Sequence, residues 1–354
     1  MIRLTWRQFR TQAVAAAGAL AVIAVALAIT GPRLDHLYQT SIVPCQARGD
    51  CSQATTAFLS HYGVLQGVGL VLVVVPAIIG VFWGAPLVAR ELETGSYKLA
   101  WTQGVSRRRW LAVKLGLVGM SSIAVAGLLS LMVTWWFSPI DRVNADPFTV
   151  FDQRDVVPFG YAVFAFALGV TAGLLLRRTL PAMAVALAGF AAVRVTVREW
   201  VRPYLLAPLR ITSALWLSIG KVPAPPHPGD WVLSDLTVNA AGRVIGQDGA
   251  ISYGGTLSGI LFHPEGGGRA VLKGVGLCPN RFPALAGAAR SGQPNPLFQQ
   301  AAQECVARLG VRSVLTYQPT SHYWPLQWCE LAIFVGLALA LAGFCFWRLG
   351  RRRT

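Results

Sequence analysis

Residues 156–176 read VVPFGYAVFAFALGVTAGLLL, and Arg177 and Arg178 follow them directly. None of the 21 residues in this stretch carries a charge. A helix rises 1.5 Å per residue, so about twenty apolar residues are needed to cross the hydrocarbon core of a bilayer. The stretch has that length and stops at two arginines, a residue type suited to the lipid headgroups. It predicts a membrane-spanning helix.

Five further stretches of the chain are also apolar and uncharged. They are residues 13–32, 64–89, 115–140, 179–193 and 331–347. Residues 179–193 are short for a span and reach full length only if Arg194 extends its side chain towards the headgroups. The composition agrees, because 54% of the 354 residues are hydrophobic and only 13% are charged. The sequence therefore predicts an all-α membrane protein with six spans.

Positive charges are distributed unevenly between the two ends of the predicted spans. One end carries Arg3, Arg7, Arg10, Arg90, Lys98, Arg107, Arg108, Arg109, Lys114, Arg177, Arg178, Arg348, Arg351, Arg352 and Arg353. The short loops at the other end carry Arg33, Arg48, Arg142 and Arg154. Because cationic residues favour the cytoplasmic side, we expect a multi-pass protein of the cell membrane with both termini in the cytoplasm. This distribution accounts for the net charge of +16 without a nucleic-acid partner.

The first twelve residues show a helical pattern with an apolar face and a basic face. Those faces consist of Ile2, Trp6 and Phe9 and of Arg3, Arg7 and Arg10. The pattern predicts an interfacial helix over residues 1–12 that lies in the membrane plane, against lipid, before the chain turns into the first span. The alternative is a simple basic flank of that span. A cleaved signal peptide is a second alternative, which the long apolar run of residues 13–32 disfavours.

Between the last two spans lies a long segment with the size of a water-soluble domain. Its strand-like pieces, separated by turn signals, are residues 231–238, 243–245 and 250–253. Residues 297–309 have the pattern of an amphipathic helix. We expect a small extracellular α/β insertion. The expected organisation is an interfacial helix, five spans, an extracellular domain and a sixth span with a cytoplasmic tail, over residues 1–12, 13–199, 200–327 and 328–354.

Four of the six cysteines fall in segments expected on the outer, oxidising side of the membrane. Cys45 and Cys51 lie in the first outer loop, and Cys278 and Cys305 lie in the long insertion. We expect two local disulfides, Cys45 with Cys51 and Cys278 with Cys305. Free thiols are the alternative.

The sequence lacks several common catalytic and metal-binding patterns. It has no GxxxxGK[ST] phosphate loop, no HExxH and no GxSxG. The five histidines are scattered, without the spacing of metal ligands. We expect no catalytic residue, no metal and no cofactor in this chain.

Residues 82–115 read FWGAPLVARELETGSYKLAWTQGVSRRRWLAVKL and link the second and third predicted spans. Pro86 is expected to bend or end the second span, and Thr94 with Gly95 breaks the helical pattern. Trp101 and neighbouring apolar residues then stand beside the arginines at 107–109. A short amphipathic element at the cytoplasmic face suits docking of a soluble partner. The alternative, that the arginines only fix the topology, does not explain Trp101.

This linking segment resembles that of ABC transporter permeases of the type-2 exporter class, in which a Glu and a Gly-Thr or Thr-Gly pair precede an apolar turn containing Ser and Arg. The matching residues are Glu91, Glu93, Thr94, Gly95, Gln103, Ser106 and Arg107. Two further stretches resemble actinobacterial permeases of this class. They are FDQRDVVPFGYAVFAFALGVTAGLLLRRTLPAMAVALAGFAAVR at 151–194 and YQPTSHYWPLQWCE at 317–330.

The resemblance implies that two permease chains, expected to be identical, form the pathway. It also implies that a separate cytoplasmic ATPase, which holds the ATP and Mg²⁺, binds them through a coupling segment at residues 89–110. Glu91, Glu93, Thr94, Gly95, Trp101, Gln103, Ser106 and Arg107 are the expected coupling residues. The expected substrate is a small hydrophobic or amphipathic compound, such as a drug, exported from the cytoplasm. The alternative is a membrane sensor or scaffold that transports nothing and binds a ligand on its outer domain.

Glu330 stands at the outer end of the sixth span, where a carboxylate is costly unless it is hydrated or paired. With Arg194 it is a candidate for an outer gate. The favoured alternative is that Glu330 caps the helix start or pairs with Arg194 or Arg198. The acidic loop at residues 138–155 is expected to be plainly solvated.

Overall fold

The computed structural model describes most of the chain. The described residues are 2–46, 51, 54–55, 57–58, 73–95, 106–143, 146–214, 227, 229–247, 310 and 312–351. The chain divides into two compact units. The membrane unit comprises Met1–Leu205 and Tyr323–Thr354, and the inserted unit comprises Leu206–His322.

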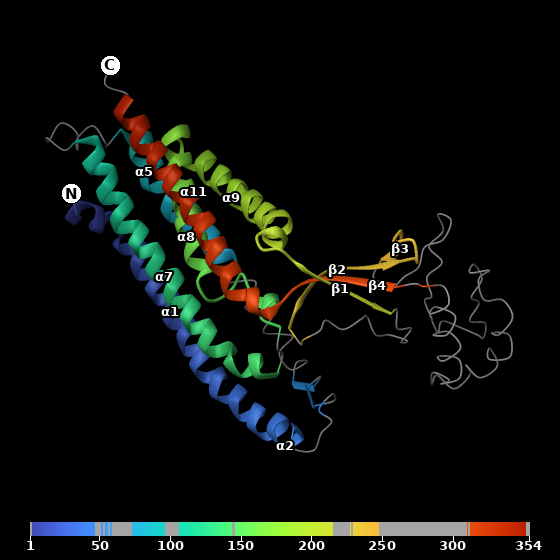
Figure 1. Cartoon of the computed structure of the whole chain (residues 1–354). Coiled ribbons are helices and arrows are strands. Elements are labelled where there is room, and N and C mark those ends of the chain that lie inside the picture. The colour runs from blue at the N-terminus through green and yellow to red at the C-terminus, as the bar shows by residue number, and fades with distance from the viewer. Residues whose placement is uncertain are drawn as a thin grey trace, which may run out of the picture. The chain divides into compact units, whose positions relative to one another are not determined.

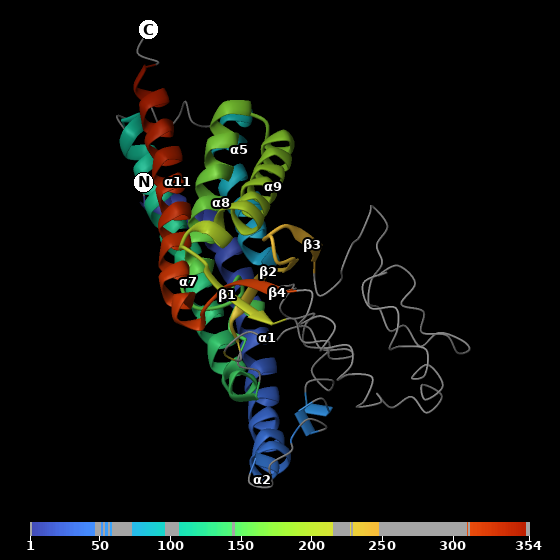
Figure 2. The ribbon, with the colours of Figure 1, turned by 45° about the vertical axis from the view of Figure 1, so that its right-hand side comes forward.

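Six helices among the described residues are long and apolar enough to cross a membrane (Figure 1). They are Phe9–Cys45, Val73–Thr94, Arg107–Val143, Val157–Leu176, Thr179–Tyr204 and Thr320–Arg351. The predicted six spans are therefore confirmed. Both chain termini lie at the same end of the membrane unit in the two views (Figure 2). We call this the terminal end, and the end where Val143 and Val157 lie the far end.

Helix α8 (Val157–Leu176) occupies the centre of the membrane unit. The helices that pack against it are α5 (Ala85–Thr94), α7 (Arg107–Val143), α9 (Thr179–Thr196) and α11 (Tyr323–Arg351). The sequence of α8 is apolar on every side, and a helix of that kind is stable where neighbours or lipid surround it. Buried residues such as Tyr161, Phe164 and Phe166 lie on different faces of the helix. The stretch with the least polar sequence thus forms the core.

The span that leads into α5 meets α8 through four glycines. A Cβ atom added to Gly80 or Gly84 would stand 2.6 Å from the carbonyl oxygen of Ala165 or Phe166, and one on Gly173 would stand 2.6 Å from that of Ala85. A Cβ on Gly169 would meet the carbonyl of Gly80. Small residues spaced by four let two membrane helices bring their backbones together. The π-helical turns Ile79–Gly84 lie within this seam.

Helix α1 runs without interruption from Ile2 to Leu37, across the predicted boundary at residue 12. The expected turn into the first span is therefore absent from this helix. Phe9 was expected to face lipid, but its ring is buried against Trp83, with the ring centroids 4.9 Å apart. Trp6, Arg7 and Arg10 are exposed, and the side chains of Ile2 and Arg3 lie outside the described part. The helix continues through π-helical turns Tyr38–Ile42 into α2 (Val43–Gln46).

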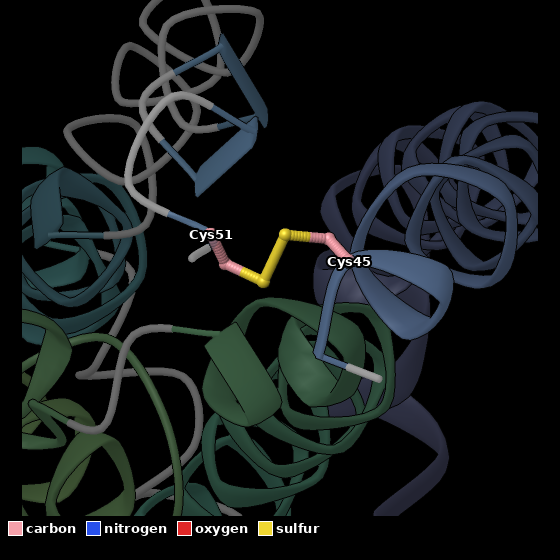
Figure 3. The surroundings of a disulfide bond; sticks show 2 residues. All are labelled: Cys45 and Cys51. Carbon is pink, nitrogen blue, oxygen red and sulfur yellow. A yellow bond between two sulfur atoms is a disulfide. The ribbon is translucent and has the colours of Figure 1, made fainter. Parts of the chain in front are cut away.

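At the end of this helix, Cys45 is joined to Cys51 by a disulfide (Figure 3). This is the pair expected from the sequence, and its formation in cells stays a prediction. Cys278 and Cys305 lie outside the described residues, so their expected pairing is also a prediction.

Helix α9 does not end before Arg194, as the sequence interpretation assumed. It continues through π-helical turns Val197–Val201 and a 3₁₀ turn Arg202–Tyr204. Arg194 therefore lies inside a 26-residue span rather than at its end. Its side chain is buried within the membrane unit rather than placed at the end of the span, which corrects the expectation.

The inserted unit contains a four-stranded antiparallel sheet with the order β1-β4-β2-β3. Its strands are β1 (Leu209–Ala214), β2 (Trp231–Val238), β3 (Val244–Gln247) and β4 (Arg312–Gln318). The strand predicted at 231–238 is confirmed, and the one predicted at 243–245 corresponds to β3. The sequence interpretation missed β1 and β4. The strand expected at 250–253 and the helix expected at 297–309 lie outside the described residues.

The inserted unit is shorter than the predicted extracellular domain of residues 200–327. Arg202 and Gln327, which were assigned to that domain, belong to the ends of the fifth and sixth spans. The first and last strands are neighbours, with Leu209 opposite Tyr317 and Ala214 opposite Arg312.

Candidate functional site

The terminal end of the membrane unit contains a buried ion pair between the second and third spans. Lys114 of α7 lies 2.7 Å from Glu91 of α5, and their side chains are 3% and 13% exposed. Lys114 Nζ also donates to the Leu87 carbonyl at 3.1 Å, and Trp110 Nε1 donates to Glu91 at 3.1 Å. A buried ammonium needs this kind of paired and hydrogen-bonded environment. We call Glu91, Trp110 and Lys114 the terminal anchor.

The terminal anchor lies at the two flanks of residues 96–105. Gly95, with a φ of 72°, ends α5 in the left-handed conformation that glycine adopts without strain. At the other flank Ser106 accepts a hydrogen bond from the Arg109 N–H at 3.3 Å, as a helix N-cap does. The break predicted at Thr94 and Gly95 is confirmed as a helix end, whereas α7 begins at Arg107, earlier than the third span predicted at residues 115–140.

The predicted coupling residues have different surroundings. Glu93 accepts hydrogen bonds from the backbone N–H and hydroxyl of Thr179, at 3.1 and 2.7 Å, and thereby links α5 to the start of α9. Glu91 belongs to the terminal anchor. Both acids thus make contacts within the chain that the sequence did not predict. Trp101 and Gln103 lie outside the described residues.

The first turns of α1 contact the same span just before α5. Pro86 has no N–H to donate to the carbonyl four residues earlier, that of Phe82. Gln12 Nε2 donates to this carbonyl at 3.1 Å, and Phe9 packs on the adjacent Trp83. Part of the predicted interfacial helix is therefore held by protein contacts.

The far end of the membrane unit contains a larger buried ion network. Its centre is Arg202, whose Nε lies 2.6 Å from Glu330 Oε2 and whose Nη2 donates to Glu330 Oε1 at 2.9 Å. The same Nη2 also pairs with Asp152. Tyr161 of α8 donates its hydroxyl proton to Glu330 of α11. We call Asp152, Tyr161, Arg194, Arg202 and Glu330 the far-end network.

Arg194 enters this network through Asp152, at 3.3 Å, and also donates to the carbonyl of Val73 at 2.9 Å. The exposed Arg198 lies 3.5 Å from the same carboxylate. Glu330 was expected to pair with Arg194 or Arg198. That expectation is wrong, because the ion-pair partner of Glu330 is Arg202.

Asp152 is the acid on which three arginines converge. Burial by itself would raise the pKa of its carboxyl group, but Arg202 and Arg194, with a smaller effect of Arg198, outweigh burial and lower the pKa below its ordinary value. Asp152 is therefore charged at neutral pH. Three buried ionic side chains, Asp152, Arg202 and Glu330, come from three different segments of the chain.

The segment before α8 is not the solvated loop that was expected. Phe151, Asp152 and Arg154 are buried. Gln327 of α11 donates to the Phe151 carbonyl and accepts from the Val157 N–H, both at 3.0 Å. The segment is therefore packed among the spans by its backbone as well as by its charges.

Arg154 and Asp155 attach the same segment to α7 and again to α11. Arg154 pairs with Asp141 of α7 at 2.5 Å. Ser130 of α7 donates to the Asp155 carbonyl at 2.8 Å, and the Tyr323 hydroxyl of α11 donates to its carboxylate. Residues 146–156 thus contact α7, α9 and α11 through polar side chains.

Among the described residues, no group of three or more His, Cys, Asp or Glu side chains is arranged to hold a metal ion. The far-end network can hold elements together by charge and release them when water or another ion replaces a partner.

Sequence reasoning missed Asp152, Tyr161, Arg202 and Gln327. The signal that could have found Arg202 and Asp152 is that charged residues beside apolar spans are seldom left unpaired.

Comparison with known proteins gives one match. A family model described as ABC-2 membrane transporter related matches residues 17–202, which is more than half of the chain. The matched region includes α5, the terminal anchor, α8 and the fifth span as far as Arg202. No curated protein and no solved structure matches the chain.

Proposed function

The chain belongs to the ABC-2 membrane transporter related family, and we propose that it is the permease subunit of an ATP-driven exporter powered by a separate ATPase chain. Permeases of this family are membrane channel components rather than catalytic subunits. In the proposal the terminal end faces the cytoplasm, in agreement with the arginines at that end. The ATP and Mg²⁺ belong to the ATPase.

The observation that supports the coupling role best is the terminal anchor. A force on residues 96–105 reaches the second span through Glu91 and the third span through Lys114, and these two side chains are joined at 2.7 Å. Because the pair is nearly buried, separating it is costly, so the two flanks move as one body. Glu93 passes the same displacement to α9 through Thr179. An ATPase docked on this segment would thus move three spans.

The pathway is proposed to lie between two copies of this chain, with a small hydrophobic or amphipathic compound as its substrate. Helix α1 supports this arrangement, because much of its apolar surface is exposed in one copy. Its exposed apolar residues include Val14, Val22, Val25 and Ile29. Lipid or a second copy must cover such a surface.

Co-purification tests the proposal directly. The tagged chain is co-expressed with each candidate ABC ATPase from the same genome, and the expected result is a stable complex whose ATP hydrolysis is stimulated by a transported amphipathic dye. Glu91→Gln should reduce this stimulation, while the exposed Glu199→Gln at the far end should leave it unchanged. Failure of every ATPase to bind, with no dye transport, would overturn the permease proposal and favour the sensor or scaffold alternative.

A further inference from the structure

We propose that Arg202 is the positioning residue of a gate at the far end, which it holds closed by pairing with Asp152 and Glu330 at the same time. This inference rests on the proposed transport function, and its test is designed to be read without an ATPase. Arg202 stands at the end of the fifth span, Asp152 in the segment before α8, and Glu330 in α11. One side chain therefore ties together three segments that are distant in sequence.

The geometry uses the edge of the guanidinium group formed by Nε and Nη2. Its Nε and Nη2 atoms face the two oxygens of Glu330, at 2.6 and 2.9 Å, and Nη2 also reaches Asp152. Arginine forms such two-pronged pairs because its donors are fixed in one plane, whereas lysine presents a single point of charge. The ring of Phe151 lies against the same guanidinium, 4.3 Å from its carbon to the ring centroid. Arg202 is therefore held on several sides.

Burial gives the network two distinct states. The exposed fractions of Arg202, Asp152 and Glu330 are 5%, 8% and 1%. Moving α11 away from Arg202 would leave a buried carboxylate without its cation unless water entered at the same moment. The contact is thus either dry and paired or separated and hydrated, which is the behaviour expected of a gate.

The contact between α8 and the second span cannot open in this manner. There the two helices pack backbone to backbone through Gly80, Gly84, Gly169 and Gly173, which carry no charge that water could stabilise after separation. The far-end network instead joins its segments by groups that water solvates well. Separation at the far end is therefore expected between the segments that Arg202 connects.

The test compares two double variants that each remove one positive and one negative charge. Arg202→Gln with Glu330→Gln removes the central pair, while Asp152 keeps Arg194 and Arg198 as partners. This design avoids the lone buried charge that Arg202→Gln alone would create, which could prevent folding. The matched control, Arg142→Gln with Asp35→Asn, removes an exposed pair at 3.8 Å near the far end.

The reporter is native Cys329, a half-buried free thiol next to Glu330. The full-length chain is placed in liposomes, treated with a membrane-impermeant maleimide, and labelling at Cys329 is followed by peptide mass spectrometry. The Arg202/Glu330 variant should label roughly tenfold faster than wild type, which corresponds to about 1.4 kcal/mol in the gate equilibrium. Its thermal midpoint should stay close to that of wild type, and the control should label at the wild-type rate.

A wild-type labelling rate in the folded Arg202/Glu330 variant would overturn the gate, as would equal acceleration in the control. If the variant does not fold, wild-type chain bound to its ATPase replaces it. Trapping with Mg²⁺, ATP and vanadate should then increase labelling at Cys329, and an unchanged rate would overturn the gate. If no ATPase binds the wild-type chain but the Arg202/Glu330 variant still labels faster, the permease proposal is rejected and the gate at the far end stands.

Discussion

Exchanging Glu91 for Gln should destabilise the chain more than exchanging Lys114 for Met. At 2.7 Å and an effective dielectric constant of about 20, the attraction between the two charges is about 6 kcal/mol before desolvation is subtracted. Removing one partner of a buried pair typically costs about 3–5 kcal/mol, because the other charge stays buried. Glu91→Gln leaves the ammonium of Lys114, which is only 3% exposed, with the neutral Leu87 carbonyl, so we expect a loss in this range.

Lys114→Met should be milder for a structural reason. The carboxylate of Glu91 keeps the hydrogen bond from Trp110 and is nearer to solvent, so we expect a loss of about 1–2 kcal/mol. The double variant should lie within about 1 kcal/mol of wild type, since a buried ion pair can often be replaced by neutral side chains.

The measurement is a double-mutant cycle of unfolding free energies in mixed detergent micelles, followed by fluorescence of the tryptophans. With these losses the cycle should give a coupling energy of at least about 3 kcal/mol for Glu91 and Lys114. If the losses of the two single variants simply add in the double variant, the two side chains do not form the buried pair and the coupling argument built on it fails.

Three further outcomes are expected. Gly173→Ala should destabilise the membrane unit by about 1–3 kcal/mol, because the added methyl group overpacks the contact between α8 and the second span. Gly336→Ala, where an added Cβ atom has no neighbour within 4 Å, should not destabilise it. Equal unfolding midpoints of the two variants would contradict the close packing of Gly80, Gly84, Gly169 and Gly173. Peptide mapping without reductant should find Cys45 linked to Cys51. Replacing both cysteines by Ser should lower the folding stability by about 2 kcal/mol, a small loss because the closed loop is short. Alkylation of both thiols in protein that has not been reduced would refute the disulfide. The pKa of Asp152 is lowered in the folded state, so the contribution of its carboxylate to folding stability should be complete above the unfolded pKa of about 3.9 and be lost as the pH falls through the lower folded pKa. The thermal midpoint of wild type should therefore fall in acid, and that of Asp152→Asn should lack this fall. A variant with the same pH profile as wild type would show that the carboxylate is not held by its arginines.

The six spans could be predicted because their signal is local. Length and absence of charge decide whether about twenty consecutive residues can cross a bilayer, and no distant partner enters that decision. The break at Gly95 was predictable for the same reason, since a left-handed glycine acts on its own helix end. The start of α7 at Arg107 was not predicted, because the three arginines at 107–109 precede the apolar stretch that marks the third span.

The far-end network could not be predicted from the sequence because its members are distant along the chain. Asp152, Arg202 and Glu330 meet only after α8, α9 and α11 have packed, and each has several candidate partners of opposite charge. The error at Arg194 had a more local cause. A helix that passes into π-helical and 3₁₀ turns has no sequence signal as clear as a glycine or proline, so the fifth span was ended too early.

The spacing of Gly80 with Gly84 and of Gly169 with Gly173 is visible in the sequence, but the pairing of the two sets is not. Each set could have faced lipid or any other span. Only the packed structure shows that their backbones approach each other.

The pairing of β1 with β4 has a consequence for how this chain can vary. Leu209, five residues after the end of the fifth span, stands opposite Tyr317, which lies shortly before the sixth. The antiparallel ladder fixes the separation of the outgoing and returning strands at about 5 Å, whatever the chain does between them. The residues beyond Ala214 and before Arg312 can therefore change in length without pulling the two spans apart. Within that stretch, positions outside β2 and β3 are the natural place for an affinity tag or a fluorescent reporter, and the place where related chains could diverge most freely.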